Sequence, residues 1–165
     1  MSRRKFIKTS ALGLGGILLA KCASGSDNET PIEENQPTAP ITKPIVISTW
    51  NHGIDANKAA WKILENGGNA LDAVEAGVRV TESDADNRSV GLGGLPDREG
   101  KVTLDACIMN HENECGAVAF LQDIEHPISV ARKVMEDTPH IMLVGKGAYD
   151  FAISKGFEHK KLLTP

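Results

Sequence analysis

The sequence predicts an α/β fold, and three observations carry that prediction. A β-branched, apolar run at residues 44–49 has the composition of a buried strand. Apolar residues at helical spacing follow between residues 55 and 82, and residues 102–109 then alternate apolar and polar side chains with the period of a strand. With 41% apolar, 24% charged and 4% aromatic residues, the composition excludes a collagen-like, coiled-coil or wholly disordered chain. We expect an α/β body over residues 43–165.

The first half of this body is predicted to be a strand followed by two helices. The strand at 44–49 should end in a turn over residues 50–53, where Asn and Gly are typical turn residues. Asp55 is the expected N-cap of the first helix, two glycines at 67–68 end it, and Asn69 caps the second. The apolar positions of the two helices are Ala59, Ala60, Ile63 and Leu64, then Leu71, Val74 and Val78.

The second half is predicted to be a loop, a hairpin and a helix–strand–helix run. Residues 83–100 are rich in Asp, Asn, Gly and Pro, and the glycines within 90–94 indicate a loop that approaches another group closely. Strand 102–109 should pair with residues 116–121 across a polar turn. The remaining elements are a helix from Pro127, a strand at 140–144 and a short helix at 148–155 ended by Gly156.

Cys107 and Cys115 flank the predicted hairpin turn. An oxidising compartment would allow a cross-strand disulfide, but we interpret them as two half-buried thiols, because Cys is a common core residue. Asp84 and Asp86 are interpreted as a solvated acidic loop rather than an acid–base pair. The five histidines are scattered singly, so we expect no metal site and no cofactor.

The start of the chain has the organisation of an export signal. Residues 1–22 carry five basic residues and no acid, and their Ser-Arg-Arg-Lys-Phe-Ile-Lys stretch resembles a twin-arginine motif. A short apolar segment leads to Cys22, which resembles the lipidated Cys of a bacterial lipobox, although Lys21 departs from that pattern. An ordinary secretory signal and an unmodified Cys22 are the alternatives. We expect an exported, periplasmic lipoprotein, anchored to the membrane through Cys22.

Charge and polarity divide the rest of the chain into a tether and a body. Residues 23–42 are polar, with four acids and no base, and should form a disordered tether. The body, residues 43–165, carries 13 basic and 18 acidic residues. A body with this balance offers no basic stripe for nucleic acid, so we exclude nucleic acid as a partner.

Three stretches together point to a known family. They are Ser-Thr-Trp-Asn at 48–51, Asn-Gly-Gly-Asn-Ala-Leu-Asp-Ala-Val-Glu-Ala-Gly at 66–77, and Ser-Val-Gly-Leu-Gly-Gly-Leu-Pro-Asp at 89–97 followed by Val-Thr-Leu-Asp-Ala at 102–106. Over residues 43–165 the chain resembles the N-terminal, or α, portion of glycosylasparaginases (aspartylglucosaminidases). Related plant-type asparaginases usually open with His-Gly-Gly, where this chain has Ser-Thr-Trp.

The resemblance implies a fold and a chemistry. The fold would be the four-layer αββα sandwich of N-terminal nucleophile hydrolases, incomplete in this chain. Family members cleave themselves before a Thr in a His-Asp-Thr stretch, and the freed Thr hydroxyl then attacks the side-chain amide of an asparagine that bears N-acetylglucosamine. This sequence has no His-Asp-Thr stretch. We therefore expect the nucleophile in a catalytic β portion that is missing from this chain, and expect this chain alone to be inactive.

Two site residues follow from the resemblance. Trp50 matches the Trp that packs beside the nucleophile and shapes the substrate pocket; a core Trp that caps the strand is the alternative. Ser89 matches the Ser whose hydroxyl bonds the α-amino group of the nucleophile and orients it; a turn Ser bonded to its own loop is the alternative. Trp61 is expected in the core.

The predicted function is an amidohydrolase that cleaves the N-acetylglucosaminyl-asparagine bond during glycoprotein breakdown. An asparaginase or isoaspartyl peptidase of the same superfamily is one alternative, and a non-catalytic, truncated lipoprotein is another. The expected partners are a glycosylated asparagine, the missing β portion and a membrane reached through the lipid anchor. A homodimer is a further expected assembly, because the chain without its β portion should expose sheet edges and an apolar face.

Overall fold

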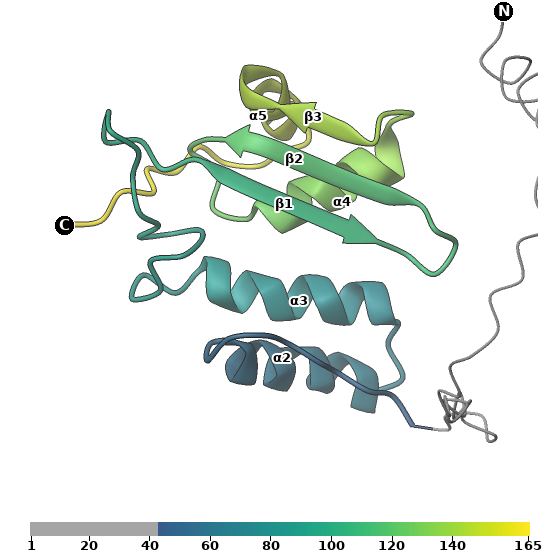
Figure 1. Ribbon diagram of the computed structural model, residues 1–165. Coiled ribbons are helices and arrows are strands. Elements are labelled where there is room, and N and C mark those ends of the chain that lie inside the picture. Colours follow the sequence, from purple (N-terminus) through teal and green to yellow (C-terminus); the bar gives the residue numbers. More distant parts are fainter. Residues whose placement is uncertain (1–42) are drawn as a thin grey trace, which may run out of the picture. The chain divides into compact units, whose positions relative to one another are not determined.

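Residues 43–165 are described by a computed structural model. The predicted signal at 1–22, Cys22 within it and the tether at 23–42 lie outside the described residues. The elements, labelled in Figure 1, are α2 (Gly53–Glu65), α3 (Ala70–Glu82), β1 (Leu104–Met109), β2 (Cys115–Leu121), α4 (Pro127–Asp137), β3 (Met142–Val144) and α5 (Gly145–Ser154). This order confirms the α/β prediction. Between residues 43 and 165, no helix is long and apolar enough to span a bilayer.

The three strands form one mixed sheet in the order β1-β2-β3. β1 and β2 form the predicted antiparallel hairpin, with Ile108 opposite Gly116. β3 pairs in parallel with β2 after the α4 crossover, which places Leu143 beside Val118. A register shift between Leu104 and Ala106 marks an irregularity at the start of β1. The sheet confirms the predicted hairpin, and β3 is shorter than the strand predicted at 140–144.

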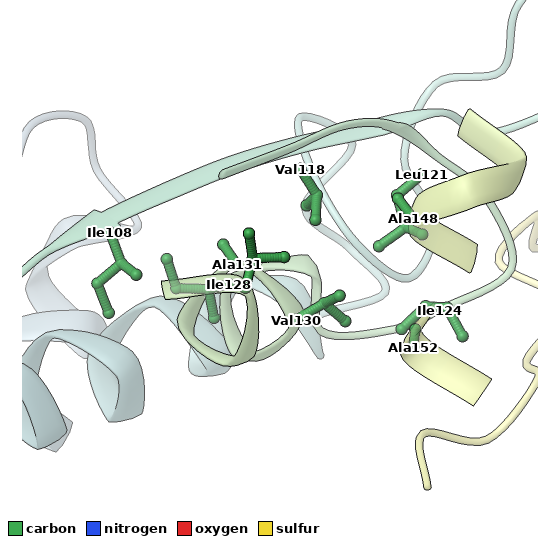
Figure 2. Packing of buried hydrophobic residues seen from close by; sticks show 10 residues of the cluster. Ile108, Val118, Leu121, Ile124, Ile128, Val130, Ala131, Ala148 and Ala152 are labelled. Atoms are coloured by element: carbon green, nitrogen blue, oxygen red, sulfur yellow. The ribbon is translucent and has the colours of Figure 1, made fainter. Parts of the chain in front are cut away.

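The hydrophobic core lies between the sheet and two helices. Figure 2 shows α4 and α5 directing apolar side chains at the same face of β1 and β2. α4 begins at Pro127, as predicted, since proline is preorganised for a first helical turn. A Cβ at Gly116 would lie 2.1 Å from the carbonyl oxygen of Ala131, so glycine is required where α4 crosses β2. The buried cluster is Ile108, Val118, Leu121, Ile124, Ile128, Val130, Ala131, Val134, Ala148 and Ala152.

The helices α2 and α3 pack side by side below the sheet in Figure 1. Their close approach requires Gly77, where a Cβ would lie 2.8 Å from the carbonyl oxygen of Ala56. Asn69 caps α3 as predicted, because its side chain accepts a hydrogen bond from the backbone N–H of Asp72 at 2.8 Å. Asp55 does not cap α2: the helix begins two residues earlier, with His52 at the N-cap position and no side-chain cap. Asp55 instead lies in the first turn of α2, where the helix dipole stabilises a carboxylate.

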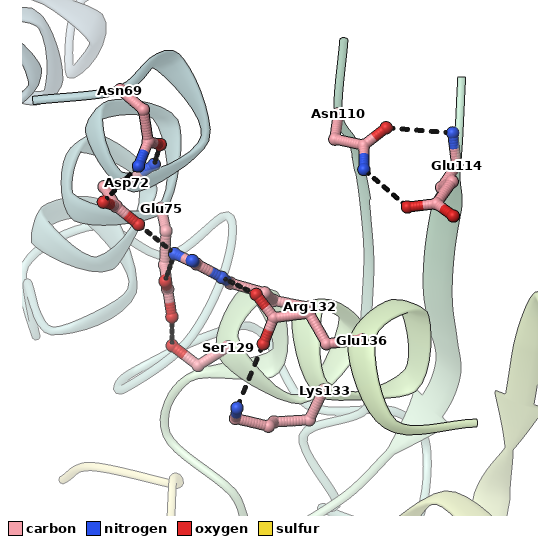
Figure 3. Close-up of polar contacts among 9 residues, drawn as sticks. All are labelled: Asn69, Asp72, Glu75, Asn110, Glu114, Ser129, Arg132, Lys133 and Glu136. Atoms are coloured by element: carbon pink, nitrogen blue, oxygen red, sulfur yellow. Dashed lines mark hydrogen bonds and ion pairs between the residues drawn. The ribbon is translucent and has the colours of Figure 1, made fainter. Parts of the chain in front are cut away.

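A polar cluster joins α3 to α4. Figure 3 shows the guanidinium of Arg132 between two carboxylates of α3 and one of its own helix. Its Nη1 donates to Asp72 at 2.6 Å and to Glu75 at 2.7 Å, and its Nε donates to Glu136 at 2.6 Å. Burial opposes both shifts, but the hydrogen bonds with the three carboxylates raise the pKa of Arg132, and those with Arg132 and Lys133 lower the pKa of Glu136. Through these ion pairs the cluster joins α3 to α4.

Several predictions of burial or pairing are wrong. Residues 44–49 form no strand in the described structure, and Ile47 is 85% exposed. The segment runs instead along α2, where the Ser48 hydroxyl donates to the side chain of Asn57. Trp61 is 43% exposed rather than in the core.

Cys107 and Cys115 are free in the described structure. Cys107 lies opposite Ala117 and Cys115 opposite Met109, so the two thiols are diagonal neighbours rather than a direct cross-strand pair. Diagonal Cβ atoms lie about 7 Å apart, well beyond the separation that a disulfide needs. The expectation of two half-buried thiols therefore holds for Cys115 and is wrong for Cys107, which is exposed.

Candidate active site

Two of the segments that resemble the family, at 48–51 and 89–97, contribute residues to the wall of one cavity of about 390 Å³. The end of the 44–49 segment, the start of α2, the end of α3 and the loop after α3 supply its walls. Thr49, the neighbour of Trp50, and Val90, the neighbour of Ser89, both line it. The fold therefore gathers at one place two stretches that are about 40 residues apart in sequence. The lining residues are Ile47, Ser48, Thr49, His52, Gly53, Ala56, Val78, Thr81 and Val90.

Trp50 lies at the turn that leads from the extended segment into α2. Its backbone has φ = 69°, a left-handed conformation that is uncommon for a bulky residue. The turn is closed by a hydrogen bond from the Gly53 N–H to the Trp50 carbonyl oxygen at 3.1 Å. The Trp50 side chain is 82% exposed, so the core-Trp interpretation is wrong for the described structure. Exposed Trp side chains are typical of surfaces that bind a ligand or another protein segment.

Ser89 is exposed and bonded within its own loop. Its hydroxyl donates to Oδ1 of Asn87 at 2.5 Å, and its backbone N–H donates to the same oxygen at 2.9 Å. These bonds match the alternative interpretation, a turn Ser bonded to its own loop, except that the acceptor is a side-chain oxygen and not a backbone oxygen. The expected role in orienting a nucleophile requires an amino group that residues 43–165 do not contain, so it stays a prediction.

The glycine-rich loop approaches its own chain closely, as predicted. A Cβ at Gly91 would lie 2.0 Å from the carbonyl oxygen of Glu82, and one at Gly93 would lie 2.5 Å from that of Ala85. Both glycines also have positive φ, a conformation that favours residues without a Cβ. The Leu92 N–H donates to the Glu82 carbonyl oxygen at 2.8 Å, and the Gly93 N–H donates to that of Leu162 at 2.8 Å. The loop is therefore held between the end of α3 and the C-terminal segment.

Glu82 is a buried carboxylate beside this loop that the sequence analysis did not single out. Its Oε1 accepts from the Ile128 N–H at 3.0 Å, and its Oε2 lies 3.2 Å from Nδ1 of His126. Burial raises its pKa, and the contacts with His126 and the Ile128 N–H oppose that rise. Its position could have drawn attention to it in the sequence. A carboxylate in the last turn of a helix interacts unfavourably with the helix dipole and therefore needs a partner elsewhere.

Comparisons with known proteins match this chain to one family. Residues 49–164 match the profile of a family described as asparaginase. The chain is 53% identical over 163 residues to the N(4)-(β-N-acetylglucosaminyl)-L-asparaginase of Elizabethkingia miricola, an alignment that covers 99% of this chain and 46% of that protein. It is 47% identical over 122 residues to the rat protein of the same name, covering 73% of this chain and 35% of the relative. The chain belongs to the glycosylasparaginase family.

The chain spans less than half the length of these two glycosylasparaginases. The family match begins at Thr49, so it includes Trp50, the α2–α3 pair, the Ser89 loop and the sheet. Within residues 43–165, no three His, Cys, Asp or Glu side chains gather where they could hold a metal ion. Residues 43–165 therefore contribute three features to the candidate site: the cavity wall, the exposed indole of Trp50 and the glycine-rich loop held by backbone hydrogen bonds.

Proposed function

We propose that this chain is the α portion of an amidohydrolase that cleaves the bond between N-acetylglucosamine and asparagine. The observation that carries the proposal is the 53% identity, over nearly the whole chain, to a protein named for that activity. The reacting group in the proposal is the hydroxyl of a Thr in a β portion outside this chain. That hydroxyl attacks the side-chain amide carbonyl carbon and the amide C–N bond breaks, so that an aspartyl ester forms and the sugar leaves as a glycosylamine that takes up the proton. Water then hydrolyses the ester and releases aspartate.

In this proposal the described residues bind and orient rather than react. Trp50 offers an exposed aromatic face to the substrate, since aromatic rings suit the apolar face of a sugar. Ser89 would exchange its bond to Asn87 for one to the α-amino group of the Thr, which holds that group as a neutral base. Their neighbours in the chain, Thr49 and Val90, line the same cavity.

The proposed partner of this chain is the β portion, packed on the bare face of the sheet. β1 and β3 direct Met109, Met142 and Val144 away from α4 and α5, and all three side chains are exposed. A second sheet on this face would bury them and would build the four-layer αββα sandwich. The exposed Ile45 and Ile47 on the 44–49 segment offer a further strand for pairing with that portion.

The test is hydrolysis of N-acetylglucosaminyl-asparagine by this chain produced together with its β portion. We expect release of aspartate by the assembled protein and none by the 165-residue chain alone. Trp50→Ala should raise KM more than it lowers kcat, and Ser89→Ala should lower kcat by about 100-fold, because it misplaces the general base. Trp61→Ala serves as a control, since this exposed Trp lies on α2 away from the cavity lining. An assembled protein that hydrolyses free asparagine but not the glycosylated form would contradict the substrate assignment.

We also propose export and lipidation at Cys22. The support is the order of features in the sequence: a basic start with two arginines, a short apolar segment, a Cys and a polar, acidic stretch. Mass spectrometry of the protein from a membrane fraction should find an acylated N-terminal Cys22. A mature chain that begins at any other residue would contradict the anchor, and Cys22→Ala should release the protein from the membrane.

A further inference from the structure

Glu82 lies where three parts of the molecule meet. It is the last residue of α3, its side chain contacts the start of α4, and its backbone contacts the Ser89 loop. The residue is 1% exposed, so protein groups replace water as the hydrogen-bond partners of the carboxylate in the folded chain. A buried carboxylate is costly unless its oxygens are hydrogen-bonded, and here each oxygen has a partner.

The side chain fixes the end of α3 against the start of α4. Oε1 accepts from the Ile128 N–H, which lies in the first turn of α4 and has no partner within that helix. Oε2 faces Nδ1 of His126, the N-cap residue of α4. Other charged groups near this pair are Arg79, one turn earlier on α3, and Glu125, which Lys160 neutralises at 2.6 Å. Two contacts on one carboxylate determine both the position and the rotation of Glu82.

The backbone of Glu82 then carries the loop. Its carbonyl oxygen accepts the Leu92 N–H at 2.8 Å, and Gly91 lies so close that a Cβ there would be 2.5 Å from the Glu82 Cα. Ser89 precedes these two contacts by two and three residues and is itself held only within its loop. A displacement of Glu82 is therefore transmitted to the loop that bears Ser89.

We propose that Glu82 is a positioning residue, whose side chain holds the end of α3 against α4 and thereby fixes the loop that carries Ser89. The loop's geometry is a claim about this chain alone, and its effect on turnover rests on the proposed function. Glu82 does not line the cavity beside Ser89 and is expected to touch no substrate. Its effect passes through the Leu92 and Gly91 contacts.

The test compares Glu82→Met and Glu82→Gln in the full chain by amide hydrogen exchange. Methionine fills the volume of Glu but accepts no bond, so we expect the Leu92 amide to exchange at least about tenfold faster. Glutamine retains an acceptor for the Ile128 N–H, so exchange at Leu92 should stay within about threefold of the unmodified chain. This rescue by Gln distinguishes hydrogen bonding from charge.

The matched control is Glu75→Met on the same helix. Glu75 also bridges α3 to α4, through Arg132 at 2.7 Å and Ser129 at 2.5 Å, but contacts no loop residue in the described structure. We expect this variant to lower the overall stability while leaving Leu92 exchange, which proceeds through local opening, within about threefold of the unmodified chain. Equal loosening of Leu92 in both Met variants, or none in Glu82→Met, would overturn the proposal. If Glu82→Met does not fold, His126→Ala removes one of the two contacts and is judged by the same criterion.

Steady-state kinetics of the assembled protein extend the test to function. Glu82→Met should lower kcat with little change in KM, because a displaced Ser89 affects the general base rather than substrate affinity. A loosened Leu92 with unchanged kcat would refute the proposed role of the Ser89 loop but not the positioning by Glu82. An assembled protein without any turnover would refute the proposed function, and the exchange data would still decide the role of Glu82.

Discussion

The two faces of the sheet differ sharply although the same three strands form both. On the inner face, Val118 and Leu121 are 1% and 0% exposed beneath α4 and α5. On the outer face, Met142 and Val144 are 53% and 55% exposed, and Met109 is 62% exposed. Strands that are apolar on both faces are typical of sheets covered on both sides. Exposed apolar patches of this kind mark interaction sites, and the difference between the faces therefore supports the proposed packing of a β portion on the outer face.

The largest effect should come from the point where a helix crosses the inner face. Gly116→Ala places a Cβ 2.1 Å from a backbone oxygen of α4, so the helix must move away from the sheet. We expect a loss of about 3 kcal/mol or more in the free energy of unfolding, measured by urea denaturation. Gly147→Ala on α5 is the control: a Cβ there meets nothing within 4 Å, and stability should stay the same or rise. A Gly116→Ala chain of ordinary stability would show that α4 does not press on β2.

Truncating one side chain on each face compares them directly. Leu121→Ala removes a fully buried side chain and should cost about 2–5 kcal/mol, whereas Met142→Ala should change the unfolding free energy by less than about 0.5 kcal/mol. Both are measured in the 165-residue chain. Repeating Met142→Ala in the assembly with the β portion should reveal a larger cost there, because the outer face would then be buried. A small cost in both settings would argue against a second layer on this face.

The Arg132 cluster should show an intermediate effect at the boundary between α3 and the core. Arg132→Met leaves three carboxylates without their shared cation and should cost about 1.5–3 kcal/mol. Lys133→Met on the same helix removes an exposed ion pair with Glu136 and should cost less than about 1 kcal/mol. Thermal denaturation of both variants at low salt checks the order. Equal costs would mean that the bonds between α3 and α4 contribute nothing beyond surface charge.

The smallest predicted effect is a pH dependence at Glu82. Because burial raises its folded-state pKa above 4.5, the folded chain binds the proton more tightly than the unfolded chain. The resulting stabilisation is full below pH 4.5 and is lost as pH rises through the folded pKa. Glu82→Gln lacks this titration, so its stability relative to the unmodified chain should increase between pH 4.5 and pH 7. Urea unfolding at these two pH values measures the difference, and a constant difference would contradict the raised pKa.

Local rules predicted those parts of the fold whose causes are local. Asn69 and Pro127 act within one helical turn, and the hairpin follows from alternation on either side of a polar turn. The strand predicted at 44–49 was wrong because a β-branched composition indicates only β propensity. A strand also needs a sheet edge to pair with, and residues 43–165 bring no such edge to this segment. Trp50 and Ser89 could be singled out only by resemblance. Glu82 was missed because its partners, His126 and Ile128, are more than 40 residues away.

Every ladder in the sheet joins strands that are neighbours along the chain, either through a tight turn or across α4. Low contact order of this kind favours rapid folding, since little loop-closure entropy is lost before contacts form. The sheet and its two covering helices can therefore form as soon as residues 104–154 leave the ribosome. The 44–49 segment is synthesised before the sheet but, in the proposed assembly, would gain a strand partner only from the β portion. Until that partner is in place, Ile45 and Ile47 stay exposed to water, and exposed apolar residues on an unpaired segment favour aggregation.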